Sequence, residues 1–160
     1  TTPLQLANAT SLLACGGESV TPNLFLKSCS NDIDQSYKYI DNKNAISIDT
    51  DSLHIINEAM WRVVYDRKVG TASHLNKIEG IEFAGKTGTA QVYNLDKGKT
   101  GTKSLQDHAL FISFAPFETP EIVVAVIVDN GGSGSAVAAP IARDIINFYF
   151  KNIKEKVAQR

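Results

Sequence analysis

Phe83-Ala-Gly-Lys-Thr-Gly-Thr-Ala-Gln-Val-Tyr93 is a strand-like stretch that contains a cation, two hydroxyl side chains and two glycines. Val92 and Tyr93 favour a pleated strand. A glycine inside a strand weakens it and usually marks a close approach by a ligand or by another backbone. We therefore expect a ligand or a backbone segment to lie against Gly88.

The alternation of side chains along a strand predicts that Lys86 and Gly88 point to one face and Thr87 and Thr89 to the other. One ligand can contact all four residues only if it lies along the edge of the strand. An edge strand has free N–H groups with which an extended peptide can pair. Lys86 would supply a positive charge for a carboxylate, and the two hydroxyls would supply hydrogen bonds.

Residues Gly80 to Thr87 also match the phosphate-loop pattern G-x-x-x-x-G-K-[ST]. That motif requires a buried strand before it and a helix that begins at its lysine. Here Ser73 to Glu79 is polar, and Thr87 to Tyr93 is typical of a strand. Nucleotide binding is therefore a remote alternative, and a structural Lys-Thr-Gly in a surface hairpin is another.

The length of 160 residues corresponds to about one domain with a core of its own. The formal net charge of -1 provides no basic field that would attract a nucleic acid. The longest apolar run, Ile122 to Val128, is too short to span a membrane. Because the chain begins at Thr1 without a methionine, we expect it to be part of a longer protein.

The cysteines and histidines show no metal-binding spacing. Cys15 and Cys29 lack a C-x-x-C arrangement, so we expect two reduced, packed cysteines, although a disulfide in an oxidising compartment stays open. His54, His74 and His108 are scattered along the chain and are more typical of surface or structural positions. We predict neither a metal site nor a cofactor.

Two helices are expected before the central stretch. The first begins at the capping box of Thr2-Pro3-Leu4-Gln5 and ends at Gly16-Gly17. The second begins at Asp49, Thr50 or Asp51 and ends near Asp66. The apolar stripes that we expect to face the core are Leu6, Ala9 and Leu13 in the first helix, and Leu53, Ile56, Met60 and Val63 or Val64 in the second.

Two strands and a helix are expected after the central stretch. The strands are Ala109 to Phe117 and Glu121 to Asp129, and the second is apolar enough for a central strand covered on both faces. The helix begins near Pro140 with the stripe Ile141, Ile145, Phe148 or Tyr149, and Ile153. Residues 27–44 and 94–104 are predicted loops, and residues 151–160 a solvated basic tail. Three antiparallel strands with helices on their faces define an α+β class.

An ordered series of segments resembles one known family. The segments are Thr2-Pro3-Leu4-Gln5-Leu6-Ala7, Met60 to Val64, Gly70-Thr71-Ala72, Gly85-Lys86-Thr87-Gly88-Thr89-Ala90-Gln91, Asp107-His108-Ala109-Leu110-Phe111, Phe114-Ala115-Pro116, Asn130-Gly131-Gly132 and Ala138-Ala139-Pro140. Together they resemble the C-terminal part of a penicillin-binding protein transpeptidase domain, of the class B elongation type that is similar to penicillin-binding protein 2. Residues 1–160 would be the C-terminal portion of one such domain.

The resemblance implies a β-lactamase/transpeptidase-like fold, an antiparallel sheet with helices on its faces that is incomplete at the N-terminal side. It implies a peptidoglycan D,D-transpeptidase that cross-links the cell wall by serine acyl transfer at the periplasmic face of the bacterial cytoplasmic membrane, with its membrane anchor upstream. The implied partners are the peptidoglycan stem peptide, β-lactam antibiotics and the upstream half of the same domain.

The chain departs from the family in one respect, because it contains neither the S-x-x-K nor the S-x-N motif. The nearest string, Thr100-Gly-Thr-Lys103, falls in a predicted loop and makes no case for a nucleophile. In the family both motifs lie upstream of the Thr2-Pro3 helix, so we expect the isolated chain to lack the nucleophile and to be inactive alone. A non-catalytic β-lactam-binding or sensor relative, or a decayed fragment, is the alternative.

The resemblance also implies roles for the central residues. Lys86 would hold the proton-relay serine and attract the terminal carboxylate of the donor peptide, and the Thr87 and Thr89 hydroxyls would bind that carboxylate. The Thr89 backbone N–H would be an oxyanion donor. Gly88 would let the acyl group approach.

Overall fold

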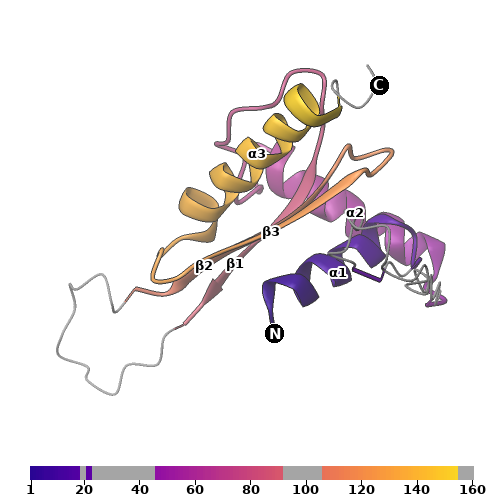
Figure 1. The fold of residues 1–160 in the computed structure, drawn as a ribbon, viewed down its shortest axis with the longest axis horizontal. Coiled ribbons are helices and arrows are strands. Elements are labelled where there is room, and N and C mark those ends of the chain that lie inside the picture. Colours follow the sequence, from indigo (N-terminus) through magenta and orange to yellow (C-terminus); the bar gives the residue numbers. More distant parts are fainter. Residues whose placement is uncertain (19–20, 23–45, 92–105, 155–160) are drawn as a thin grey trace, which may run out of the picture.

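The computed structural model describes residues 1–18, 21–22, 46–91 and 106–154. Figure 1 shows a small sheet between helices, with α1 on one side and α3 on the other. The elements are α1 (Pro3–Ala14), α2 (Thr50–Tyr65), β1 (Ala84–Ala90), β2 (His108–Ala115), β3 (Ile122–Val128), the wide π-type turn η2 (Gly134–Ala138), α3 (Ala139–Phe148) and a second wide turn η3 (Tyr149–Lys154).

The sheet is antiparallel, with the strand order β1-β2-β3. In its register Lys86 lies opposite Ile112, and Gly88 lies opposite Leu110. The predicted α+β class is confirmed, and so is the position of β1 at an edge of the sheet that the described strands form.

The side chains of β2 alternate between two apolar clusters, one on each face of the sheet. Phe111 joins the cluster that contains Val126 and, from α3, Ile146. Phe114 joins the cluster that contains Met60 of α2 and Ala84 of β1. Helix α3 therefore packs on the first face, whereas α2 contributes to both clusters, with Val64 in the first and Met60 in the second.

Helix α1 has the predicted cap but buries a different residue from the predicted stripe. The Thr2 side chain accepts a hydrogen bond from the Gln5 N–H, and the Gln5 side chain accepts one from the Thr2 N–H. Leu6 and Leu13 are half-buried and Ala9 is exposed, whereas Thr10 is buried. Thr10 tolerates burial because its hydroxyl donates a 2.7 Å hydrogen bond to the Leu6 carbonyl.

Helix α2 begins after Asp49, whose carboxylate accepts a hydrogen bond from the Ser52 N–H at 2.9 Å. Leu53, Met60 and Val64 are buried as predicted. Ile56 is 40 % exposed, so its assignment to the core is wrong. It lines an open groove beside β1 instead.

Most of the predicted stripe of α3 is also wrong, because Ile141, Ile145 and Phe148 are exposed, although Tyr149, the alternative to Phe148, is half-buried. Ile153 belongs to the turn η3, and its side chain lies outside the described residues. The helix instead turns Ala139, Ala142 and Ile146 toward the sheet. These residues also recur at helical spacing, and the two alanines let the helix backbone approach the strands closely.

In the described sheet β3 lies at an edge, whereas the prediction of a central strand concerns the complete domain and stays a prediction. The middle strand is β2, and β3 pairs with β2 along one side. Its apolar sequence is explained by its two covered faces, since both α1 and α3 pack against it.

Several remaining predictions concern the loops and the cysteines. Cys15 is a free thiol but is exposed, so the expectation that it is packed is wrong. Cys29, Val92, Tyr93, the predicted loops at 27–44 and 94–104, and most of the C-terminal tail lie outside the described residues. Among the described helices, none has the length and apolar character needed to cross a membrane.

Candidate functional site

The predicted site residues Lys86 to Thr89 all lie on β1, at the edge of the sheet. Two hydrogen bonds identify backbone groups that point away from β2, one in β1 and one in the residue that precedes it. The Phe83 N–H donates to the Tyr65 hydroxyl at 3.4 Å, and the Thr87 carbonyl accepts from the Lys86 ammonium group. Because backbone groups alternate in an antiparallel ladder, the Thr89 N–H also points to this free edge.

Lys86 lies on the face of the sheet that α1 and α2 border. Its side chain lines an open groove of about 410 Å³ together with Leu13, Ile56, Ala59, Met60, Val63 and Ile112. The groove is apolar except for the lysine, so the methylene groups of Lys86 contact apolar side chains while its ammonium group stays exposed. A positive charge at the mouth of an apolar groove can attract a carboxylate.

Thr87 points to the other face, as the alternation predicts. Its hydroxyl lies 3.0 Å from the hydroxyl of Thr71, which belongs to the segment between α2 and β1. No role for Thr71 was predicted from the sequence, where Gly70-Thr71-Ala72 is only one of the segments that resemble the family. No spacing rule pairs two threonines that are 16 residues apart.

The close backbone approach expected at Gly88 is present. It comes from Gly134 in η2, which is buried against β1 and β2. A Cβ atom at Gly134 would lie 2.5 Å from the Leu110 carbonyl oxygen and nearer still to that of Gly88. Glycine is therefore required at position 134, because neither carbonyl can move without breaking the sheet.

The segment that enters β1 is attached to the end of α2 through Tyr65. The Lys77 ammonium group donates to the Val64 carbonyl and lies 4.4 Å from the centre of the Tyr65 ring. Burial raises the pKa of Tyr65 and lowers the pKa of Lys77. Trp61 stacks on Tyr65 and donates from its Nε1 to the Glu82 carboxylate at 3.0 Å. These contacts hold β1 in place from its first residue.

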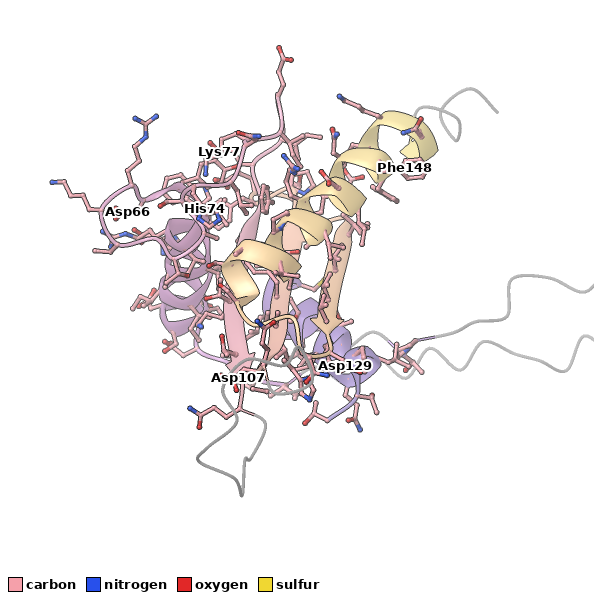
Figure 2. The ribbon with its side chains drawn as sticks, turned by 90° about the vertical axis from the view of Figure 1, so that its left-hand side faces the viewer. Asp66, His74, Lys77, Asp107, Asp129 and Phe148 are labelled. Carbon is pink, nitrogen blue, oxygen red and sulfur yellow. The ribbon has the colours of Figure 1, made fainter. Side chains whose placement is uncertain are left out.

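Several titratable groups lie around the two ends of the sheet. Figure 2 shows Asp66, His74 and Lys77 around the end of α2, and Asp107 and Asp129 at the opposite end of the sheet. His108 accepts a hydrogen bond from the Asn130 N–H at 3.0 Å, which is a structural role. Within the described part of the chain, no group of three or more His, Cys, Asp and Glu side chains could hold a metal ion.

The phosphate-loop alternative has no support in this geometry. Lys86 and Thr87 lie inside β1, and no helix begins at them. Before the strand, Gly80 forms a tight turn with a φ of 70°, closed by the bridge between Ile78 and Ile81. The backbone N–H groups that would cradle a phosphate are arranged along a strand instead.

The chain belongs to the family described as the penicillin binding protein transpeptidase domain, which matches residues 1–147. One curated relative is the peptidoglycan D,D-transpeptidase MrdA of Haemophilus influenzae, which is 36% identical over 156 residues. That alignment covers 92% of this chain and 23% of the relative, so the chain spans about a quarter of the relative's length.

Solved structures agree with this assignment. The crystal structure of Pseudomonas aeruginosa PBP2 in complex with WCK 5153 has a TM-score of 0.74 and 34% identity, covering 96% of this chain and 31% of that one. The imipenem acyl-enzyme complex of penicillin-binding protein A from Mycobacterium tuberculosis has a TM-score of 0.69 and 28% identity, covering 94% and 31%. The predicted fold is confirmed as part of a transpeptidase domain.

Proposed function

We propose that residues 1–160 are the C-terminal portion of one transpeptidase domain, and that the free edge of β1 is one wall of its active site. The domain would cross-link peptidoglycan by serine acyl transfer and would be acylated by β-lactams. The observation that carries the proposal is the edge of β1 on which Lys86, Thr87 and Thr89 follow one another and with which no described strand pairs.

The edge is suited to hold the end of a peptide. An extended donor peptide can pair with the free backbone groups of β1 as an added strand. Its terminal carboxylate would meet the ammonium group of Lys86 and the hydroxyls of Thr87 and Thr89, and a β-lactam carboxylate would occupy the same place. Gly88 has no side chain, so the scissile carbonyl can approach the strand closely.

The Thr89 N–H would stabilise the oxyanion that forms when the carbonyl is attacked. Removing one such donor from an enzyme typically costs about 3 kcal/mol of transition-state stabilisation. This contribution is large, but it does not replace a nucleophile. No serine of this chain has a lysine three residues later.

The nucleophile and the proton-relay serine would therefore come from an upstream half of the same domain. Lys86 would then hold the relay serine and keep it ready to move protons between nucleophile and leaving group. The groove beside Lys86 is open to receive that half. We place the complete protein at the periplasmic face of the cytoplasmic membrane, where its substrate lies, with its anchor outside this chain.

The test replaces Lys86 in a protein that contains this chain and the upstream half. Lys86→Met should reduce acylation by a fluorescent penicillin at least about 100-fold, because it removes a charge that contacts both substrate and relay serine. Its melting temperature should stay unchanged because the ammonium group is exposed. Lys68→Met, at an exposed lysine after α2, is the matched control.

Labelling of the Lys86→Met protein at the parental rate would show that Lys86 has no such role. The isolated 160-residue chain is a second arm of the experiment. Intact-mass spectrometry after incubation with penicillin should show no adduct on it. A stoichiometric adduct would reveal a nucleophile within these residues and would contradict the proposed division of the site.

A further inference from the structure

The hydroxyl pair between Thr71 and Thr87 points to a residue outside the Lys-Thr-Gly strand that controls how this strand binds an anion. The two oxygens are 3.0 Å apart, which is hydrogen-bond distance for two hydroxyl groups. We propose that Thr71 is a positioning residue that orients the Thr87 hydroxyl toward the carboxylate of the substrate or of a β-lactam. The inference rests on the proposed function, because it assigns the same anion to the same strand.

The backbone of Thr71 is held on both sides by α2. The Gly70 N–H donates to the Asp66 carbonyl at 2.8 Å, and the Ala72 N–H donates to the Val63 carbonyl at 2.9 Å. Ala72 is fully buried. The Thr71 hydroxyl therefore extends from a backbone that is fixed against a helix, although its side chain is exposed.

Gly70 shows how closely this segment approaches the helix. A Cβ atom at Gly70 would lie 2.5 Å from the carbonyl oxygens of Arg62 and Asp66. The end of α2 thus determines where Thr71 lies. Through Thr71 it determines where the Thr87 hydroxyl lies, so a helix outside the anion site positions one of its donors.

The count of protons gives the direction of the hydrogen bond when an anion is bound. A hydroxyl group has one proton to donate and can accept through its lone pairs, whereas a carboxylate can only accept. If Thr87 donates its proton to the carboxylate, it cannot also donate to Thr71. Thr71 must then donate to Thr87, which gives a chain from Thr71 to Thr87 to the carboxylate in which each bond strengthens the next.

Thr87 is also held through its main chain, since its carbonyl accepts from the Lys86 ammonium group. Thr89 provides a contrast. Within the described residues its hydroxyl has no hydrogen-bonding partner, and its side chain is exposed. Of the Thr87 and Thr89 hydroxyls, only that of Thr87 is oriented before the anion binds. A change that removes this orientation should weaken binding of the anion specifically.

The test measures the second-order acylation rate constant of a protein that contains this chain and the upstream half of the domain. The variants are Thr71→Val, which keeps the shape but removes the hydroxyl, and Thr71→Ser, which keeps the hydroxyl. Thr119→Val, at an exposed threonine in the turn between β2 and β3, is the control. Each protein is acylated with benzylpenicillin and with its methyl ester, in which the carboxylate is blocked.

Thr71→Val should lower the rate constant with benzylpenicillin roughly tenfold, the typical effect of losing a hydrogen bond that supports a charged group. With the methyl ester the decrease should be less than about twofold, because the anion is absent. Thr71→Ser should restore most of the rate, and Thr119→Val should change neither rate. All four proteins should melt within about 2 °C of one another, because the substitutions are on the surface.

An equal decrease with both compounds would show that Thr71 supports the fold of the strand rather than the anion, and would overturn the inference. An unchanged rate with benzylpenicillin would overturn it too. Either result leaves the proposed function intact if the parent protein is acylated. A parent protein that neither compound acylates would instead refute the proposed function, and the role of Thr71 with it.

Discussion

Two candidate site residues on β1 are contacted by residues that lie far from them in the sequence. Thr87 is contacted by Thr71, and Gly88 is covered by Gly134. These neighbours are small, and their effects come from one hydroxyl and from one missing Cβ atom. The site thus depends on single atoms at positions that carry no reactive group themselves.

Gly134 allows a direct prediction at this scale. Gly134→Ala would push a methyl group into the carbonyl oxygens of Gly88 and Leu110 and should destabilise the fold by about 1–3 kcal/mol, the usual cost of overpacking. Urea denaturation of the protein that contains the whole domain measures this change in the free energy of unfolding. Ala136→Ser, at an exposed position of the same turn, should cost less than about 0.5 kcal/mol. Equal stability of the Gly134→Ala and parent proteins would contradict the close approach.

At the scale of elements, α2 has two separate tasks. Its N-terminal half begins at the Asp49 cap and contributes Leu53 to the core. Its C-terminal end positions the strand, since Val63 and Asp66 hold the backbone around Thr71, and Tyr65 holds the entry of β1. Local capping therefore decides where the helix starts, whereas its far end connects to the candidate site.

The Asp49 cap makes stability depend on pH. The Ser52 N–H and hydroxyl donate to the Asp49 carboxylate and lower its pKa below the ordinary value of 3.8. A lowered folded-state pKa stabilises the fold above the unfolded-state pKa, and this stabilisation is lost as the pH falls through the folded-state value. Asp49→Asn keeps a good cap without the charge.

Between about pH 5 and pH 3, the melting temperature of the parent should therefore fall more steeply than that of Asp49→Asn. Other carboxylates, such as Asp66, contribute equally to both proteins, so the difference between the two curves isolates the cap. Parallel curves over this range would show that the Asp49 carboxylate does not stabilise α2.

At the scale of the whole molecule, the described residues leave three apolar surfaces open. These are the outer edge of β3, the stripe of α3 that contains Ile141, Ile145 and Phe148, and the groove beside Lys86. A strand edge is the surface most prone to pair with another chain, because its free backbone groups add directional hydrogen bonds to apolar contact.

The isolated 160-residue chain should therefore self-associate at roughly tens of micromolar, which light scattering measures. Ile127→Lys places a charge on β3 and should reduce the association, because lysine is a residue that protects natural edges. Ile145→Lys, on the exposed stripe of α3, is the matched control and should leave it unchanged. The β3 edge is not the associating surface if the parent chain is monomeric, or if Ile145→Lys reduces the association more than Ile127→Lys does.

The elements and the strand that carries the candidate site were predictable from the sequence. The caps at Thr2 and Asp49, the ends of α1 and α2, and the position of β1 follow from hydrogen bonds and backbone preferences that act over a few residues. The opposite orientation of Lys86 and Thr87 follows from the two-residue period of a strand. For such features the nearby sequence contains all the interacting groups.

The tertiary structure alone decided which face of α3 is buried and which residues support the site. In α3 the predicted apolar stripe and the observed buried stripe both recur at helical spacing. Only the distance between helix and sheet decides that Ala139 and Ala142 are buried and that Ile141 and Ile145 are exposed. The contact of Thr71 with Thr87 likewise exists because α2 and β1 pack side by side. Contacts between distant segments depend on the whole packing arrangement, and local sequence patterns do not encode them.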